Sequence, residues 1–317
     1  MNTQPNTTTH SPDTTEGEAT EPLSVRPPSV QINYCGLSGG KDSTATALWL
    51  IHESGVPKES IRFTMCDTGN EHRFTYEHID MLSRRFQEWG CGPVILLKPE
   101  RDFYELAKHK TRFPSMKARF CTQFLKVIPT REDVTALRRL GFDVIVNSGV
   151  RASESEERSA LPERGFDDMF GCIVNRPLLH WSFENVVDLH NRHDVPLNPL
   201  YAYGAKRVGC FPCVNARKSE IKLISIHFPE RIDMIREKEN SGIGLNGRFQ
   251  SFFQANIMPD RFKSREYTNR KGKNLKVGTI DDVVEWSHTM HGGIEEPLPL
   301  FDDDASLVCP SGSGMCE

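Results

Sequence analysis

From Gln31 onward, short apolar runs of strand-like composition alternate with stretches of helical spacing, and this alternation limits the fold more than any other feature. The strand-like runs are Ile32–Cys35, Ile61–Cys66, Val94–Leu97 and Val144–Val146. Strands that are separated by helices are joined by crossover connections, which make neighbouring strands parallel. The pattern therefore predicts an α/β protein in which helices cover both faces of a parallel sheet. Such sheets bind ligands at the carboxyl ends of their strands.

The composition excludes two broad classes of protein. The chain of 317 residues is 37% hydrophobic, which is enough to fill a core and excludes a mainly disordered chain. No apolar run approaches the roughly 18 to 20 residues that a membrane span needs, so no membrane partner is expected. The net charge of −4 gives no overall attraction to nucleic acid. Nine cysteines cannot all pair within the chain, and no signal-like segment opens it, so we expect a reducing, cytoplasmic location.

The composition and the apolar periodicity of the sequence change along the chain. Residues 1–28 are rich in Thr, Pro, Ser and Asn without apolar periodicity, which predicts a disordered tail. Residues 29–218 carry the strand–helix alternation and are expected to form a nucleotide-binding domain. Residues 219–300 are less regular, which predicts a mostly helical C-terminal region with a basic loop. Residues 301–317 form a cysteine-containing tail, which we expect to fold back on a metal site.

A glycine-rich turn follows the first strand and opens the first helix. Its residues are Ser38, Gly39, Gly40, Lys41, Asp42 and Ser43. The two glycines let the backbone approach an anion, and the helix N-terminus offers unpaired N–H groups and a positive dipole potential. The two serine hydroxyls add donors and Lys41 adds charge. The turn therefore predicts a cradle for phosphate or pyrophosphate.

This turn is not the common P-loop, because Cys35 and Asp42 stand where that motif needs glycine and Ser or Thr. It instead resembles the PP-loop of the ATP pyrophosphatase superfamily. The resemblance implies a Rossmann-like, adenine nucleotide alpha hydrolase-like fold. It also implies cleavage of ATP between its α- and β-phosphates, with AMP attached to a substrate.

Further motifs are similar to those of the phosphoadenylylsulfate (PAPS) reductase family. Asp67, Thr68 and Gly69 follow the second strand, where Asp67 could hold Mg²⁺ or order the nucleotide. A Gly-x-Arg-x-x-x-Ser-x-x-Arg pattern after the fourth strand comprises Gly149, Arg151, Ser155 and Arg158. Arginine forks suit phosphate or sulfate oxygens, so Arg151, Arg158 and the later Arg207 are predicted ligand contacts. With Lys41 and Asp67, Arg151 and Arg158 are the predicted catalytic residues.

The cysteines predict a metal or redox site. Cys210 and Cys213 form a CxxC, and Cys121 lies where iron–sulfur adenylylsulfate reductases carry a cluster cysteine. Thr122 replaces the second cysteine of that family's pair, so one ligand is missing, and Cys309 or Cys316 could supply it. The resemblance implies a 4Fe–4S cluster; Zn²⁺ and a metal-free redox pair remain alternatives. The other cysteines before the tail are expected to be buried small hydrophobes.

Two departures from classical PAPS reductases bear on function. The chain lacks their C-terminal Glu-Cys-Gly-(Leu or Ile)-His motif, and its Ser38–Ser43 loop keeps the ATP-pyrophosphatase form. We therefore expect ATP-dependent adenylyl transfer for sulfur transfer, as in sulfurtransferases and phosphorothioation enzymes. A sulfite-forming PAPS or APS reductase is one alternative. A non-catalytic nucleotide-binding subunit of a phage, mobile-element or CRISPR-associated system is another.

The partners remain open at this level. Basic residues between Arg261 and Lys276 interleave with Phe262 and Tyr267, which fits either contact with RNA or DNA or a solvated basic loop. A homodimer or accessory partner proteins are compatible with the family resemblance.

Overall fold

The computed structural model describes residues 30–244, 249–253, 258–268 and 272–289. The predicted tails at 1–28 and 301–317 therefore lie outside the described residues, and so do Cys309 and Cys316. Within the described ranges, no helix combines the length and the apolar character needed to cross a bilayer.

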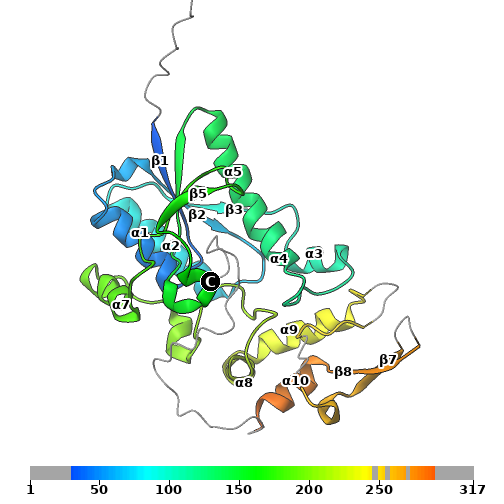
Figure 1. Cartoon of the computed structure of the whole chain (residues 1–317). Helices are drawn as coiled ribbons and strands as arrows, with labels where there is room; N and C mark the ends of the chain where they lie inside the picture. Colours follow the sequence, from blue (N-terminus) through cyan, green and yellow to red (C-terminus); the bar gives the residue numbers. More distant parts are fainter. Residues whose placement is uncertain (1–29, 245–248, 254–257, 269–271, 290–317) are drawn as a thin grey trace, which may run out of the picture.

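A six-stranded sheet forms the centre of the molecule (Figure 1). Its strand order is β3-β2-β1-β4-β6-β5, and every neighbouring pair is parallel except β5 with β6. The strands are β1 (Gln31–Gly36), β2 (Ile61–Cys66), β3 (Val94–Leu97), β4 (Asp143–Asn147), β5 (Arg164–Asp167) and β6 (Cys172–Asn175). The expected Rossmann-like α/β fold is confirmed.

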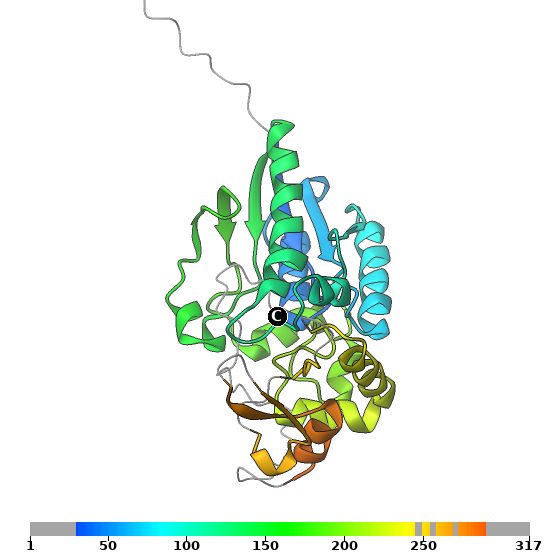
Figure 2. The ribbon, with the colours of Figure 1, turned by 90° about the vertical axis from the view of Figure 1, so that its right-hand side faces the viewer.

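Helices cover both faces of this sheet, as expected (Figures 1 and 2). One face packs on α1 (Lys41–His52), α2 (Arg73–Glu88) and α7 (Phe183–Arg192), through side chains such as Leu48, Leu82 and Val186. The other face packs on α5 (Ile128–Arg139), where Val134 joins Tyr34 and Val146 in a separate apolar cluster. Because both faces are covered, consecutive side chains of β1, β2 and β4 are buried, rather than every second one.

The connections carry shorter elements that the sequence did not predict individually. The helical ones are η1 (Lys58–Ser60), α3 (Phe103–His109), α4 (Phe120–Thr122), η2 (Gln123–Val127), η3 (Ala152–Glu154), α6 (Glu156–Ser159) and η4 (Pro199–Tyr203). The segment η2 is a π-helical turn that continues α4 into α5. π-helical turns are rare and often mark functional sites.

The C-terminal part contains helices and one hairpin. Its elements are α8 (Lys218–His227), α9 (Pro229–Asn240), η6 (Asp260–Phe262), β7 (Arg265–Thr268), β8 (Asn274–Val277) and α10 (Ile280–Ser287). Both views show these yellow-to-orange elements gathered at one end of the molecule (Figures 1 and 2). Their apolar side chains form one core with Phe103 and Phe113 from the connection after β3.

Candidate functional site

The Ser38–Ser43 loop joins β1 to α1 and is closed by its own hydrogen bonds. The Ser38 amide donates to Ser43 Oγ (3.2 Å), and the Gly40 amide donates to Ser38 Oγ (3.2 Å). Gly39 has a φ of 78°, and a Cβ there would lie 2.8 Å from Thr75 Cγ2, so the turn needs glycine. The N-cap residue of α1 is Gly40, which has no side chain to cap the first-turn amides, the groups that bind anions at a helix start.

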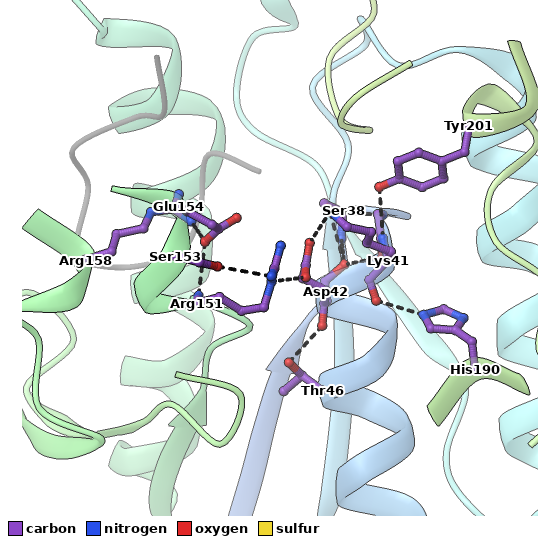
Figure 3. Close-up of polar contacts among 12 residues, drawn as sticks. Ser38, Lys41, Asp42, Thr46, Arg151, Ser153, Glu154, Arg158, His190 and Tyr201 are labelled. Carbon is purple, nitrogen blue, oxygen red and sulfur yellow. Dashed lines mark hydrogen bonds and ion pairs between the residues drawn. The ribbon is translucent and has the colours of Figure 1, made fainter. Parts of the chain in front are cut away.

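Three residues from the second half of the fold hold this loop, and Figure 3 shows two of them, His190 and Tyr201. The Lys41 amide donates to Tyr201 Oη (3.1 Å), and the Asn198 side chain donates to the Gly39 carbonyl (3.2 Å). His190 Nε2 lies 2.8 Å from the Lys41 carbonyl oxygen. Burial lowers the pKa of His190, against the opposing effect of its two carbonyl partners. The phosphate loop is therefore braced from α7 and η4, far away in sequence.

A buried chain of charges begins at Lys41 (Figure 3). Lys41 Nζ lies 2.8 Å from one oxygen of Asp42, and Arg151 Nε lies 2.7 Å from the other. Burial lowers the pKa of Lys41, but Tyr201 and Asp42 outweigh it, so the pKa lies above its usual range. Lys41 is therefore a permanent cation.

The two predicted arginines differ in their surroundings. Arg151 donates through Nε to Asp42 and through Nη1 to Ser153 Oγ (3.2 Å), so part of its guanidinium group is already occupied by protein acceptors. Arg158 is 1% exposed and pairs with Glu154, yet its Nε and Nη2 atoms have no hydrogen-bond partner among the described residues. An unsatisfied buried guanidinium is costly. Arg158 is thus the arginine with donors left for an anion.

Gly149 and Ser155 position these arginines. A Cβ on Gly149 would lie 3.0 Å from the Asp42 carbonyl, so the chain after β4 can approach α1 this closely only with glycine. Ser155 caps α6, because its Oγ accepts from the Arg158 amide (3.2 Å). Arg207 lies elsewhere, in the turn before Cys210, where it opposes the burial-driven rise in the pKa of Glu220.

A cavity opens beside the phosphate loop at the carboxyl ends of β1, β2 and β4. Leu37, Met65 and Val146 supply apolar lining, and Ser38, Ser43 and Gly149 connect it to the loop. The remaining lining includes Glu71, Lys126, Asn147, Ser148, Gly209 and Cys66. The expectation that Cys66 is only a buried hydrophobe is incomplete, because this partly buried thiol lines the cavity.

The Asp67–Thr68–Gly69 segment brings two carboxylates together. Tyr76 Oη donates to Asp67 Oδ1 (2.7 Å) and lies 3.2 Å from Glu71 Oε2. Burial and these two carboxylates raise the pKa of Tyr76, so it remains a hydroxyl donor. Glu71 also accepts from the amide and hydroxyl of Thr68 (3.1 and 2.6 Å).

Cys121 and Cys210 each lie near Cys213, and Cys210 contacts Glu71 of this acidic pair. Burial and the neighbouring Cys213 raise the pKa of Cys121 to about 11. Burial raises the pKa of Cys210 to about 12, while Lys126 opposes the rise. Cys210 Sγ lies 3.4 Å from Thr68 Oγ1 and 3.8 Å from Glu71 Oε1. Within the described ranges, however, no three His, Cys, Asp or Glu side chains are arranged to hold a metal ion.

Several residues of the site escaped the sequence reasoning. Glu71, Lys126 and His190 carry no motif that spacing alone would reveal. Glu71 lies two residues after the Asp67–Gly69 segment, and Lys126 lies five residues after Cys121, so closeness to a recognised motif was the signal that could have found them. His190 had none, because its contact with Lys41 depends on the packing of α7 against α1.

Comparisons with known proteins find similar sequences over most of the chain. The sequence model of the phosphoadenosine phosphosulfate reductase domain matches residues 33–216, more than half of the chain. The "Uncharacterized 37.8 kDa protein in gpa 5'region" of Escherichia phage 186 is 33% identical over 336 residues, covering 90% of this chain and 97% of the phage protein. The adenosine 5'-phosphosulfate reductase of Bacillus pumilus is 27% identical over 157 residues, covering 49% of this chain and 64% of that protein. Among solved structures, a phosphoadenylyl-sulfate reductase from Candida auris in a phosphate complex has a TM-score of 0.43 and 23% identity, covering 60% of this chain and 84% of that one.

Proposed function

This chain belongs to the phosphoadenosine phosphosulfate reductase domain family, and on that premise we propose that it is an enzyme that binds ATP and transfers its adenylyl group to an acceptor. The observation that supports this most is the Ser38–Ser43 loop. Its glycines, hydroxyls and uncapped helix start suit a polyphosphate, and Lys41 stays protonated beside it. The polyphosphate would lie on this loop, and the nucleoside would enter the adjoining cavity.

In the proposed reaction, an acceptor oxygen attacks the α-phosphorus. A new oxygen–phosphorus bond forms, the bond to the β-phosphate oxygen breaks, and pyrophosphate leaves. Lys41 and the unpartnered N–H groups of Arg158 would stabilise the charge that accumulates on the phosphate oxygens. Asp67 and Glu71 supply the oxygen ligands that Mg²⁺ prefers, and a bound Mg²⁺ would neutralise further phosphate charge.

The finer proposal is that the activated acceptor then receives sulfur. The sulfur of a hydrosulfide would bond to the activated atom of the acceptor while the bond from that atom to the AMP oxygen breaks, so that AMP leaves and the hydrosulfide proton passes to solvent. Cys121, Cys210 and Cys213 are the donors that would hold a 4Fe–4S cluster, with Cys309 or Cys316 as the fourth ligand. Thiolates suit such a cluster, which would supply iron that binds sulfur, and they suit Zn²⁺ as well.

Two other functions have specific support. The Bacillus relative is named as an adenosine 5'-phosphosulfate reductase, which favours sulfite formation as the second candidate. The third candidate is a nucleotide-binding subunit that acts with partner proteins in a phage or mobile-element setting, and the relative that matches almost the whole chain comes from a phage. The partners of this proposal are an adenine nucleotide, nucleic acid contacted through Arg261–Lys276, and a second copy of the chain or an accessory protein.

The test is the exchange Lys41→Ala, with Lys206→Ala as the matched control because Lys206 is an exposed cation outside the loop. We expect wild type and the control to bind MgATP in calorimetry and to form AMP and pyrophosphate with an acceptor, and Lys41→Ala to lose turnover. Unchanged pyrophosphate release by Lys41→Ala would refute the assigned role. Sulfite release from adenylylsulfate would favour the reductase, and ATP binding without turnover would favour the accessory subunit.

A further inference from the structure

One stretch of the chain has a charge opposite to that of the whole molecule. Six cations and no carboxylate lie between residues 106 and 130, whereas the complete chain has a net charge of −4. Five of these cations precede Cys121 and define the 108–119 basic segment: Lys108, Lys110, Arg112, Lys117 and Arg119. The sixth is Lys126, which lines the nucleotide cavity.

The charges of this segment are not neutralised by the part of the protein that the structure describes. None of the five cations forms an ion pair with a described carboxylate. Arg112 Nη2 donates only to Ser115 Oγ (3.3 Å), and Arg119 Nε donates to the Met116 carbonyl (3.3 Å). Arg119 Nη1 is buried and has no hydrogen-bond partner among the described residues. A buried donor without a partner is costly, so an acceptor supplied by a ligand would stabilise it.

Apolar side chains are exposed next to these cations. The Phe124 side chain is 39% exposed, and Lys110 Nζ lies 4.3 Å from the centre of its ring. Met116 is 59% exposed within the segment itself. An exposed aromatic ring beside cations is the combination on which single-stranded nucleic acids stack a base while their backbone is held by charge.

The segment lies between the site and the C-terminal hairpin. Arg119 is two residues before Cys121, so one end of the segment adjoins the cysteine group. At the other side, Phe113 packs edge-on against Phe252 (5.1 Å between ring centres). Nearby in the chain, the Arg265 guanidinium of β7 lies 4.0 Å over the ring of Phe249. Figures 1 and 2 show α4 on the same side of the molecule as β7 and β8.

We propose that the 108–119 basic segment binds the backbone of a single-stranded polynucleotide and directs it toward the cavity, so that a nucleic acid is the acceptor. This inference rests on the proposed adenylyl transfer and names its substrate class. A nucleic acid fits better than an acidic protein or a membrane surface, because the cations follow one another along the chain, an exposed aromatic ring lies beside them, and Lys126, farther along the same stretch, lines the cavity.

The test uses the full-length protein and fluorescently labelled oligo-U and oligo-dU of about 20 nucleotides, followed by anisotropy from about 50 to about 300 mM salt. The triple variant Lys108→Ala/Arg112→Ala/Lys117→Ala removes three exposed cations. The control Arg139→Ala/Arg164→Ala/Lys222→Ala removes three exposed cations from α5, β5 and α8. We expect the affinity of the test variant to fall at least about tenfold, and the steepness of its plot of log affinity against log salt to decrease by about 2. The control variant should bind as wild type does.

A second variant tests the stacking contact. Phe124→Ala should weaken oligonucleotide binding roughly tenfold without changing the salt slope. The inference is overturned if wild type binds neither oligonucleotide, if the test and control variants bind equally, or if anionic vesicles or polyglutamate bind with the same dependence on the segment. MgATP binding is measured on the same preparations. Its retention shows that only this inference has failed, whereas its absence in wild type shows that the proposed function has failed.

Discussion

At the scale of single residues, the partner of a side chain matters as much as its identity. The pattern around Arg151 and Arg158 predicted two ligand-binding forks, but the structure gives them different surroundings. Arg151 neutralises Asp42, which already binds Lys41, while Arg158 keeps two N–H donors unsatisfied within the described residues. Arg151 therefore contacts the loop through Asp42, and Arg158 remains the arginine that we propose as a contact for the nucleotide.

Tyr201 offers a test at the same scale. Its hydroxyl accepts from the Lys41 amide (3.1 Å), at the helix start where a phosphate oxygen would bind. In Tyr201→Phe that competitor is absent, so MgATP should bind about 2- to 10-fold more tightly, which corresponds to one net hydrogen bond. Calorimetry on wild type and on Tyr203→Phe, which alters the next tyrosine of η4, provides the comparison. Weaker binding by Tyr201→Phe would show instead that the hydroxyl binds the phosphate.

At the scale of elements, the C-terminal part is joined by a buried carboxylate. Glu239 near the end of α9 is 2% exposed and accepts from the amides of Phe252 (2.7 Å) and Ile280 (2.8 Å). It thereby joins α9 to the start of α10 and to the 249–253 segment. Burial raises the pKa of Glu239 to about 7, although both amide contacts oppose the rise.

This pKa predicts a pH dependence of stability. The folded state binds the proton more tightly than the unfolded chain, so the stabilisation is complete below pH 4.5 and is lost as pH rises through about 7. The free energy of unfolding should therefore fall by up to about 3 kcal/mol over this window. Urea denaturation at several pH values should show a smaller fall in Glu239→Gln. Glu237→Gln, an exposed change on the same helix, should keep the fall; equal pH dependence in both variants would contradict the assignment.

At the scale of the whole molecule, distant segments converge on the cysteines. An isolated antiparallel β-bridge between Glu71 and Cys210 joins the segment after β2 to the CxxC turn. The carbonyl oxygen of Asn70 accepts a hydrogen bond from the Phe211 amide (2.7 Å). Arg231 of α9 donates to Asn70 and to the Phe211 carbonyl. One apolar core contains side chains from Phe103 to Trp286, so the CxxC turn is placed by the same packing that holds the C-terminal helices.

This convergence makes metal content a property of the assembled molecule. Anaerobically purified wild type should contain iron and acid-labile sulfide and absorb near 400 nm, and Cys210→Ser should lose them. Cys172→Ser, a buried cysteine on β6, serves as the control. A colourless protein with stoichiometric zinc would contradict the cluster and support a zinc site. A protein that contains neither iron nor zinc would support the metal-free redox pair. Parallel measurements on Cys309→Ser and Cys316→Ser would identify the tail ligand.

The sequence alone determined the parallel sheet, the helices on both faces and the phosphate loop, because these depend on local signals. Alternation of apolar runs with helical spacing reports burial, and Gly39 reports a backbone conformation and a close approach that other residues do not tolerate. The tertiary structure decided that Asp42 neutralises Arg151, that His190 and Tyr201 brace the loop, and that Cys66, Glu71 and Lys126 line one cavity. These contacts join residues separated by tens to more than a hundred positions, and only packing selects such partners.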